Sequence, residues 1–487
     1  MKKFSLKMIA MLMMSLLVGA TIISCDDDDD DDPVLAAPTV TAPESQEIVT
    51  GESLDLTFDF VAPAGFKSSA VTAANGTAVI KTDGVNGATS GNVVVTFTAG
   101  EQPGAGSVLV TISDLQNQSD DATSVLTVVG EQTTFEINAN ITENTTWETG
   151  KVYVLKTRVA VTAGTTLTIQ PGVVVKGEAG TGANASALLI ARGAQLMAEG
   201  TAEAPIIFTS IADEIMPGEI VSPNLDPDLN GLWGGLIILG NAPISADAAS
   251  VQIEGIPPSD QNGLYGGDNA ADNSGVIRYV SIRHGGANIG EGNEINGLTL
   301  GGVGSETVIE YVEVIANQDD GIEWFGGTVN VHHAIVWNAG DDAIDTDQSW
   351  GGTLDNFVVI NPGDECFELD GPEGEMVAKH TIMNGSVYAL DADGLVDNDD
   401  NSNLDMSKVY FRDLKEGQDF DQIPTVYTCV FENLQATIPD GFAVTDFFKG
   451  GSDAFTTNVG LGENTVGADL SKFQNWTWSS VSGQISK

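Results

Sequence analysis

The sequence predicts an all-β protein in which a small β-sandwich is followed by a long parallel solenoid. The first observation is a pattern that occurs three times between residues 317 and 371: an apolar strand, an Asn, a carboxylate pair and a short strand with a further acid. Corresponding acids recur at almost equal intervals, as Asp319, Asp341 and Asp364 do. A repeat of strands and turns with a period in this range is typical of a solenoid. The second observation is composition, because 56 glycines and only 18% charged residues among 487 favour β structure over long helices.

The N-terminal segment, residues 1–24, predicts a signal peptide. Three lysines accompany a largely apolar run from Met8 to Ile23, which is short for a membrane span and suited to a leader. The residues that follow, Ile22-Ile23-Ser24-Cys25, resemble the lipobox of bacterial lipoproteins. This resemblance implies that Cys25 is lipidated and becomes the N-terminus of the mature protein.

An unbroken run of acids, Asp26 to Asp32, lies within an acidic tether predicted for residues 25–35. Seven adjacent like charges cannot pack together and are expected to be extended. One interpretation of the run is a solvated spacer. The alternative is an export signal, because the run resembles the acidic signal behind the lipidated Cys of Bacteroidota surface lipoproteins. That resemblance implies a lipid-anchored protein of the outer membrane that faces the cell exterior.

The mature chain is strongly acidic. Without the leader it has 19 − 3 = 16 basic and 69 acidic residues, so its formal charge is 16 − 69 = −53. Nucleic-acid binding needs a basic surface, and the sequence therefore argues against that class of partner. Carboxylates that lie close together need counter-ions or raised pKa values, so divalent cations are expected partners.

Residues 36–130 predict the β-sandwich. Strand-like runs recur between turn signals, and apolar and polar residues alternate in several of them, as in the run from Leu54 to Phe60. The set resembles bacterial immunoglobulin-like domains, without the Cys pair of antibody domains. The resemblance implies a spacer or an adhesive module, and nothing in this stretch predicts chemistry.

Residues 140–440 predict the solenoid. The phrase from Gly164 to Gly172 (G-T-x-L-x-I-x-P-G) resembles the opening coils of right-handed parallel β-helices with the pectin-lyase-like fold. From about residue 147 to residue 478 the chain also resembles a group of Bacteroidota surface lipoproteins of ill-defined function. The phrases that carry this resemblance are Arg283-His-Gly-Gly286, Asp319-Asp-Gly-Ile-Glu-Trp-Phe-Gly-Gly327 and Gly340-Asp-Asp-Ala-Ile-Asp-Thr-Asp347. Residues 441–487 are expected to cap the open end of the coil. Four asparagines at similar intervals are expected to stack as a structural ladder at a tight bend: Asn317, Asn338, Asn361 and Asn384.

The acids of the repeat form the first candidate site, which we term the carboxylate ladder. Stacked coils would place these like charges side by side, and no Lys or Arg occurs from residue 319 to residue 371. Calcium takes six to eight oxygen ligands in flexible geometry and would relieve the repulsion. The alternative is that many of the acids simply face solvent. The residues expected to bind calcium are Asp320, Glu323, Asp342, Asp345 and Glu368.

A second candidate site is the acidic stretch from residue 391 to residue 400. Its pattern, D-x-D-G-x-x-D-x-x-D, has the spacing of calcium loops that resemble thrombospondin type 3 repeats, and it departs from the EF-hand pattern. The alternative is an acidic surface loop. The expected ligands are Asp391, Asp393, Asp397 and Asp400.

A third candidate is a catalytic centre. The N-x-D and D-D phrases around Asp319, Asp341 and Asp342 resemble those of polygalacturonases, which hydrolyse with paired carboxylates. The likeness ends in the next coil, where the His and the basic residues of that family are missing. His284 is a further candidate. Trp324 and Trp350, if exposed, would form a sugar-stacking platform beside the acids.

Two functions follow from these patterns. The first is a lipid-anchored outer-membrane surface protein whose β-helix binds a glycan or a protein partner with calcium, and an outer-membrane transporter is a further candidate partner. The second is a calcium-dependent polysaccharide lyase or glycosidase. The missing bases favour the first.

Overall fold

The computed structural model describes residues 34–288 and 295–485. The predicted signal peptide, Cys25 and most of the acidic tether lie outside the described residues. Two compact units are present, Met1–Glu131 and Gln132–Lys487, and the regular secondary structure of their described residues is almost wholly β-strand, as the sequence predicts. In the part of the chain that the structure describes, no helix is long and apolar enough to span a membrane.

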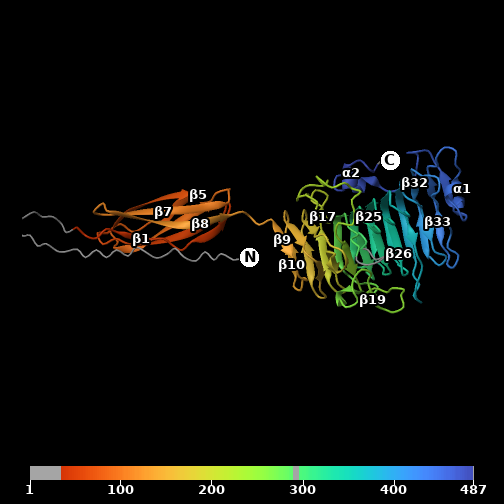
Figure 1. The fold of residues 1–487 in the computed structure, drawn as a ribbon, viewed down its shortest axis with the longest axis horizontal. Coiled ribbons are helices and arrows are strands. Elements are labelled where there is room, and N and C mark those ends of the chain that lie inside the picture. The colour runs from red at the N-terminus through yellow and green to blue at the C-terminus, as the bar shows by residue number, and fades with distance from the viewer. Residues whose placement is uncertain (1–33, 289–294, 486–487) are drawn as a thin grey trace, which may run out of the picture. The chain divides into compact units, whose positions relative to one another are not determined.

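The first unit is a sandwich of two four-stranded sheets (Figure 1). Alternate residues of the strands, such as Leu56, Phe58 and Phe60, point into the core between the sheets. With the strands lettered in chain order as A, A′ and B to G, the sheets read A-B-E-D and A′-G-F-C, an order that immunoglobulin domains also have. The sandwich is as predicted, and its immunoglobulin kinship stays a prediction. The sheets run, in spatial order, β1 (Thr39–Thr41), β3 (Ser53–Val61), β6 (Ser90–Ala99), β5 (Gly76–Thr82), and β2 (Gln46–Val49), β8 (Ser119–Val129), β7 (Gly104–Asp114), β4 (Phe66–Ala74).

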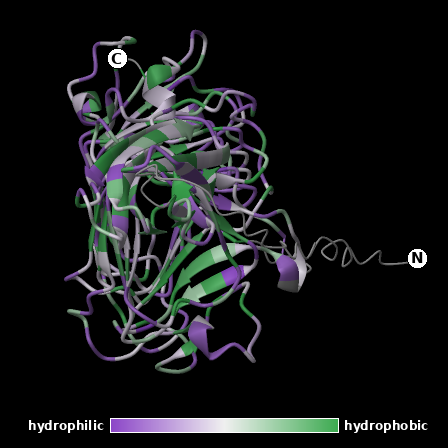
Figure 2. Cartoon of the chain, turned by 90° about the vertical axis from the view of Figure 1, so that its left-hand side faces the viewer, coloured by the Kyte–Doolittle hydropathy of each residue, from purple (hydrophilic) through white to green (hydrophobic). Residues whose placement is uncertain are grey.

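The second unit is a parallel β-helix. Its larger sheet joins 17 described strands, and all of their pairings are parallel. Figure 2 shows hydrophobic residues concentrated on strands and hydrophilic residues on loops. The strands are β9 (Thr134–Ile137), β10 (Thr145–Trp147), β11 (Val152–Leu155), β13 (Thr166–Ile169), β14 (Val174–Gly177), β16 (Gln195–Glu199), β17 (Ile206–Ser210), β21 (Gly275–Arg283), β23 (Val308–Ile315), β25 (Asn330–Trp337), β27 (Thr353–Ile360), β29 (His380–Tyr388), β31 (Leu404–Ser407), β32 (Tyr410–Arg412), β33 (Val430–Glu432), β34 (Leu434–Ala436) and β35 (Thr456–Asn458).

A second parallel sheet, of eight described strands, closes the coil. It is the sheet that carries the acids of the ladder. Its strands are β12 (Arg158–Val161), β15 (Ala187–Ile190), β18 (Leu236–Leu239), β22 (Leu298–Gly301), β24 (Ile322–Phe325), β26 (Ile344–Asp347), β28 (Glu368–Leu369) and β30 (Asp397–Asn398).

Short elements lie outside the two sheets of the coil. A small hairpin belongs to the loop between β18 and β21, and the helices are single turns. These elements are β19 (Val251–Gln252), β20 (Leu264–Tyr265), α1 (Val444–Phe447), α2 (Trp478–Val481), and the 3-10 turns η1 (Gly182–Asn184), η2 (Gln261–Gly263), η3 (Ser452–Phe455) and η4 (Leu470–Phe473).

The expected asparagine ladder is wrong for two of its four members. Asn338 and Asn361 occupy equivalent positions, but the equivalent position one coil earlier is that of Ala316 and not of Asn317. The N–H of Ala316 donates to the carbonyl of Trp337, just as the N–H of Asn338 donates to the carbonyl of Ile360. Asn384 lies in a different column, a sharp bend within the strands of the larger sheet. Left-handed backbone recurs there in register at Tyr279, Tyr311, His333, Asn356, Asn384, Lys408 and Asn433.

The C-terminal segment corrects the expected cap. The coil continues past residue 440, because β35 pairs with β34 and Phe447 packs in the coil interior. The chain then returns along the side of the coil. Phe473, Trp476 and Trp478 pack on the outer face of the larger sheet, against residues such as Trp337. This segment therefore covers a face of the coil, whereas the sequence led us to expect it at the open end.

Candidate functional site

The strand register brings the acids of the repeat into columns. Glu323, Asp345, Glu368 and Asp397 occupy the same position of β24, β26, β28 and β30. Neighbouring strands in a sheet lie about 4.8 Å apart, so each of these carboxylates has another as its neighbour. The stacking predicted from the almost equal intervals of the repeat is thus present.

A parallel column lies at the turn before these strands. The N–H of Asp342 donates to Oδ1 of Asp320 at 3.0 Å, and the N–H of Glu365 donates to Oδ1 of Asp342 at 2.7 Å. The same register places Asn296 one coil before Asp320, because the N–H of Gly297 donates to the Asp320 carbonyl. Asp320 and Asp342 therefore each orient the backbone of the next coil through one oxygen and keep a second oxygen for other partners.

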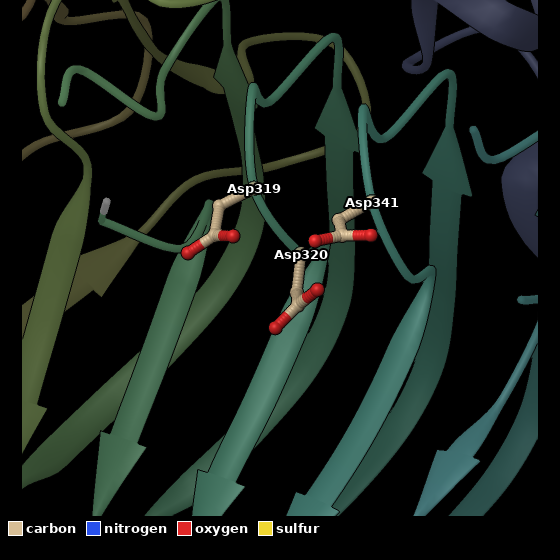
Figure 3. Close-up of side chains that lie close together, drawn as sticks. All are labelled: Asp319, Asp320 and Asp341. Carbon is tan, nitrogen blue, oxygen red and sulfur yellow. The ribbon is translucent and has the colours of Figure 1, made fainter. Parts of the chain in front are cut away.

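Two groups of three carboxylates result. Asp319, Asp320 and Asp341 each place one oxygen within 4.8 Å of the others, and Figure 3 shows them where the turns lead into the neighbouring strands β24 and β26. Asp341 is exposed and Asp319 half-buried, so solvent reaches this group. The second group consists of Asp320, Glu323 and Asp345, all three buried.

Asn296 completes the buried group, and the sequence analysis missed it. Its amide nitrogen donates to a carboxylate oxygen of Glu323, the side chain is only 3% exposed, and its Oδ1 has no hydrogen-bond partner within the described residues. The signal was available, because Asn296-Gly-Leu matches Asp320-Gly-Ile one coil later. A neutral amide oxygen without a partner thus belongs to a side chain that contacts Glu323, one of the three buried acids.

The electrostatics of the ladder disfavour ionisation of every acid. Burial, and then the neighbouring carboxylates, raise the pKa values of Asp320, Glu323 and Asp345 well above their usual range. Burial and a nearby acid also raise the pKa values of Asp347 and Asp370, each to about 7. No Lys or Arg of the described chain forms an ion pair with these five acids. The group must therefore either retain protons or bind a cation.

The second calcium site expected from the sequence is wrong in its geometry. Residues 391–400 run along a turn and through β30, so no three of their carboxylates come together within the described chain. Asp391 is paired with Nζ of Lys415 at 3.0 Å, and Asp393 and Asp400 are exposed. Asp397 instead extends the ladder column below Glu368.

The expected aromatic platform is also wrong. Trp324 and Trp350 are fully buried, and their rings stack inside the coil with centroids 4.6 Å apart. Strand alternation is the cause: Glu323 points outward in β24, so the next residue, Trp324, points inward. Neither ring is available to a ligand.

His284 is excluded as a catalytic group by its burial. It is fully buried, and its Nδ1 donates to the Leu229 carbonyl at 2.5 Å. Burial lowers the pKa of His284, so the ring is neutral. Of the other catalytic candidates, Asp342 is buried, whereas Asp319 and Asp341 remain accessible.

The other buried charges near His284 hold the returning C-terminal segment. Arg283 and Glu313 are both fully buried, with Nη2 of the Arg 3.8 Å from Oε2 of the Glu. Glu313 also accepts hydrogen bonds from the N–H groups of Trp478 and Ser479, and the Arg283 guanidinium lies 5.1 Å from the Trp478 ring centroid. These residues therefore have a structural task outside the ladder.

Comparison with known proteins identifies the coil. Residues 139–413 match the family model of the pectate-lyase-like β-helix domain. No curated protein matches the sequence. Among solved structures, a mutant of the SrpA adhesin from Streptococcus sanguinis is similar at 17% identity and a TM-score of 0.17, over 20% of this chain and 58% of the adhesin. The family 28 exopolygalacturonase of Yersinia enterocolitica is similar at 12% identity and a TM-score of 0.21, over 87% of this chain and 90% of the enzyme. TM-scores this low support no argument from either structure.

Proposed function

The chain belongs to the family of pectate-lyase-like β-helix domains, and from that premise we propose that its β-helix binds a glycan, or a protein partner, with calcium at the carboxylate ladder. The observation that carries the proposal is the buried contact of Asp320, Glu323 and Asp345 without a neighbouring cationic side chain in the described chain. Bringing like charges together in a buried site is unfavourable unless protons or a cation compensate for them.

The residues present suit calcium. Calcium prefers carboxylate and amide oxygens, six to eight in number and in flexible geometry. Asp320, Glu323 and Asp345 would hold it, together with Oδ1 of Asn296, which otherwise has no partner. The group contains no thiol or imidazole, the ligands that zinc prefers.

We further propose that Cys25 carries a lipid and anchors the protein in the outer membrane, facing the exterior. The lipobox-like residues and the acidic run behind them support this location. Replacing Cys25 by Ala should release the protein from the membrane fraction, and retention of the variant there would refute lipidation. An outer-membrane transporter stays a candidate partner, and it can be sought by co-purification of the anchored protein.

Calcium titration of the mature protein by calorimetry tests the site. We expect binding to the chelator-treated protein, and a large loss of affinity in Asp345→Asn. Glu306→Gln is the matched control, because Glu306 is an exposed acid of the same unit that lies outside the ladder. A glycan array with and without calcium then tests the ligand class. If both variants bound calcium with equal affinity, the ladder would not be the calcium site.

A calcium-dependent polysaccharide lyase or glycosidase is the second candidate. The accessible pair Asp319 and Asp341 beside Asp320 favours it. However, inverting hydrolysis needs carboxylates about 6.5–9.5 Å apart, wider than the 4.8 Å limit within which this group gathers its oxygens. Incubation with a broad panel of polysaccharides decides the question. Cleavage that Asp341→Ala abolishes, with binding intact, would establish the enzyme.

A further inference from the structure

The N-terminal β-sandwich has one apolar end. Seven large aliphatic side chains are exposed in its described part, and two of them, Val79 and Val125, lie on the strands β5 and β8. The other five lie at the end where the chain enters the sandwich. They form what we term the apolar tip, with exposed fractions of 81% for Val34, 41% for Leu35, 52% for Val61, 74% for Val85 and 50% for Leu115.

Hydrogen bonds and strand pairing show that these residues share one end. Val61 ends β3 opposite Thr39, the first residue of β1. The N–H of Leu35 donates to the Gln116 side chain at 3.0 Å, and the N–H of Leu115 donates to the Gly65 carbonyl at 2.9 Å. The loop of Val85 packs against this point, because a Cβ on Gly65 would lie 3.1 Å from Gly87.

The opposite end of the sandwich is polar. Its connections contain Thr50-Gly-Glu52, Asn75 and Gly100-Glu101-Gln102, and it has no exposed large aliphatic residue within the described chain. The chain leaves the sandwich there, since Val129 pairs with Val49. The two ends thus differ in chemistry, and the apolar one is next to the N-terminal tether.

We propose that the apolar tip docks on the lipid surface in which the protein is anchored. The inference rests on the proposed lipid at Cys25. Val34 lies nine positions after Cys25, a reach on the order of 30 Å at full extension, so the tip cannot move far from the bilayer. Such a tether gives a high effective concentration, and a small apolar patch then suffices for contact.

The surroundings of the tip fit a membrane interface. Scattered aliphatic residues on a surface are ordinary, but five at one end form a patch of the kind that marks an interaction site. Lys67 is exposed beside it and hydrogen-bonds to the Asn117 side chain. A lysine next to apolar residues is suited to the headgroup level, where its stem contacts the apolar layer and its ammonium the phosphates.

Fluorescent labels on the full mature chain test the proposal. The N-terminal Cys25 of the mature chain is condensed through its 1,2-aminothiol with a cyanobenzothiazole-bearing lipid in phosphatidylcholine vesicles, which consumes the Cys25 thiol. A Cys429→Ser background leaves the buried Cys366 as the remaining native thiol. An environment-sensitive dye is attached at Val85→Cys or, as the matched control, at the exposed Val79→Cys. We expect a blue shift and quenching by nitroxide-labelled lipid for the dye at position 85 only.

Equal emission from the two positions, unchanged when the protein is released from the vesicle, would overturn the proposal. A second variant pair guards against an effect of the dye itself. Val61→Glu should abolish the shift at position 85, whereas Val125→Glu, an identical charge change away from the tip, should preserve it. Because the lipid is attached chemically, the test does not depend on whether the cell lipidates Cys25. If the cell does not, the proposed anchor is wrong, but the coupled protein still shows whether the apolar tip contacts lipid.

Discussion

Replacing Asp345 by Asn should stabilise the protein in a chelator and destabilise it in calcium. Asp345 lies between Glu323 and Glu368 in the register of β24, β26 and β28, and it is buried. Asn has nearly the same shape but does not ionise. The substitution therefore removes repulsion from the metal-free protein and a ligand from the calcium-bound one.

The structure sets the size of the effect. At a strand spacing of about 4.8 Å and an effective dielectric constant of about 20, each ionised neighbour repels Asp345 by roughly 3 kcal/mol. Protons bound by the ladder relieve much of this, so we expect the variant to gain about 1–3 kcal/mol in chelator at pH 8. The unit has 487 − 131 = 356 residues, and at about 2 cal/mol/K of unfolding entropy per residue the gain raises Tm by about 1–4 °C.

Calcium should reverse the order of the two proteins. An ion present at about 1,000 times its Kd stabilises the folded state by about 4.1 kcal/mol, or about 6 °C here, which exceeds the gain of the variant in chelator. The variant should lose most of that increase. Thermal unfolding followed by circular dichroism, with Glu306→Gln as the control, measures both conditions. If Asp345→Asn lowered Tm equally in chelator and in calcium, the residue would be an ordinary core position and the reasoning would be refuted.

Three further predictions follow from the packing and charges around the ladder. Trp350→Ala should cost about 3–5 kcal/mol of unfolding free energy, measured with denaturant, because the ring is fully buried in the coil; a cost below about 1 kcal/mol would contradict that packing. In chelator, Tm should fall as pH rises from about 4 to 7, because burial raises the pKa of Asp347 to about 7 and the folded state then binds a proton that the unfolded chain releases. This one group contributes at most about 4 kcal/mol, and a Tm that rises over the same range would show that another group dominates. Glu313→Ala should cost about 3–5 kcal/mol and expose the C-terminal segment to protease, because Arg283 would be left buried without its ion-pair partner. Glu310→Ala, which removes a partly exposed ion pair, should cost at most about 1 kcal/mol and leave the protease pattern unchanged.

The sequence predicted the register of the ladder because a parallel coil converts equal intervals into contact. Residues 22 or 23 positions apart, such as Glu323, Asp345 and Glu368, fall at one point of consecutive turns without any knowledge of the side chains between them. Residues whose interval is shorter by a single position do not fall at the same point of consecutive turns. Asn317 and Asn338 are 21 apart, and they are not equivalent.

The inward direction of Trp324, which contradicts the expected sugar-stacking platform, follows from the same regularity of the coil. Strand alternation fixes the direction of Trp324 once Glu323 is placed outward, so its burial was predictable. The return of the C-terminal segment along the side of the coil was not predictable from the sequence. Its contacts join Glu313 to Ser479, 166 residues away, and no local pattern specifies which face of a coil a distant segment will cover.

The limits of the ladder argue that it is a discrete site and not a generally acidic surface. In the turn column, Asn296 precedes the acids and Gly394 follows them; the acids are Asp320, Asp342 and Glu365. Gly394 is equivalent to Glu365 one coil later, because its carbonyl accepts a hydrogen bond from the N–H of Cys366, as the carbonyl of Glu365 accepts one from the N–H of Ala343. Solvated acids need no such boundaries and no burial. Asn296 and Gly394 thus bound the acids of the turn column, whereas Asp397 continues the neighbouring column by one coil. If calcium binds elsewhere on this protein, replacing Asn296 by Leu should leave its affinity unchanged; if the site is the ladder, the loss of that oxygen should weaken binding while every acid is still present.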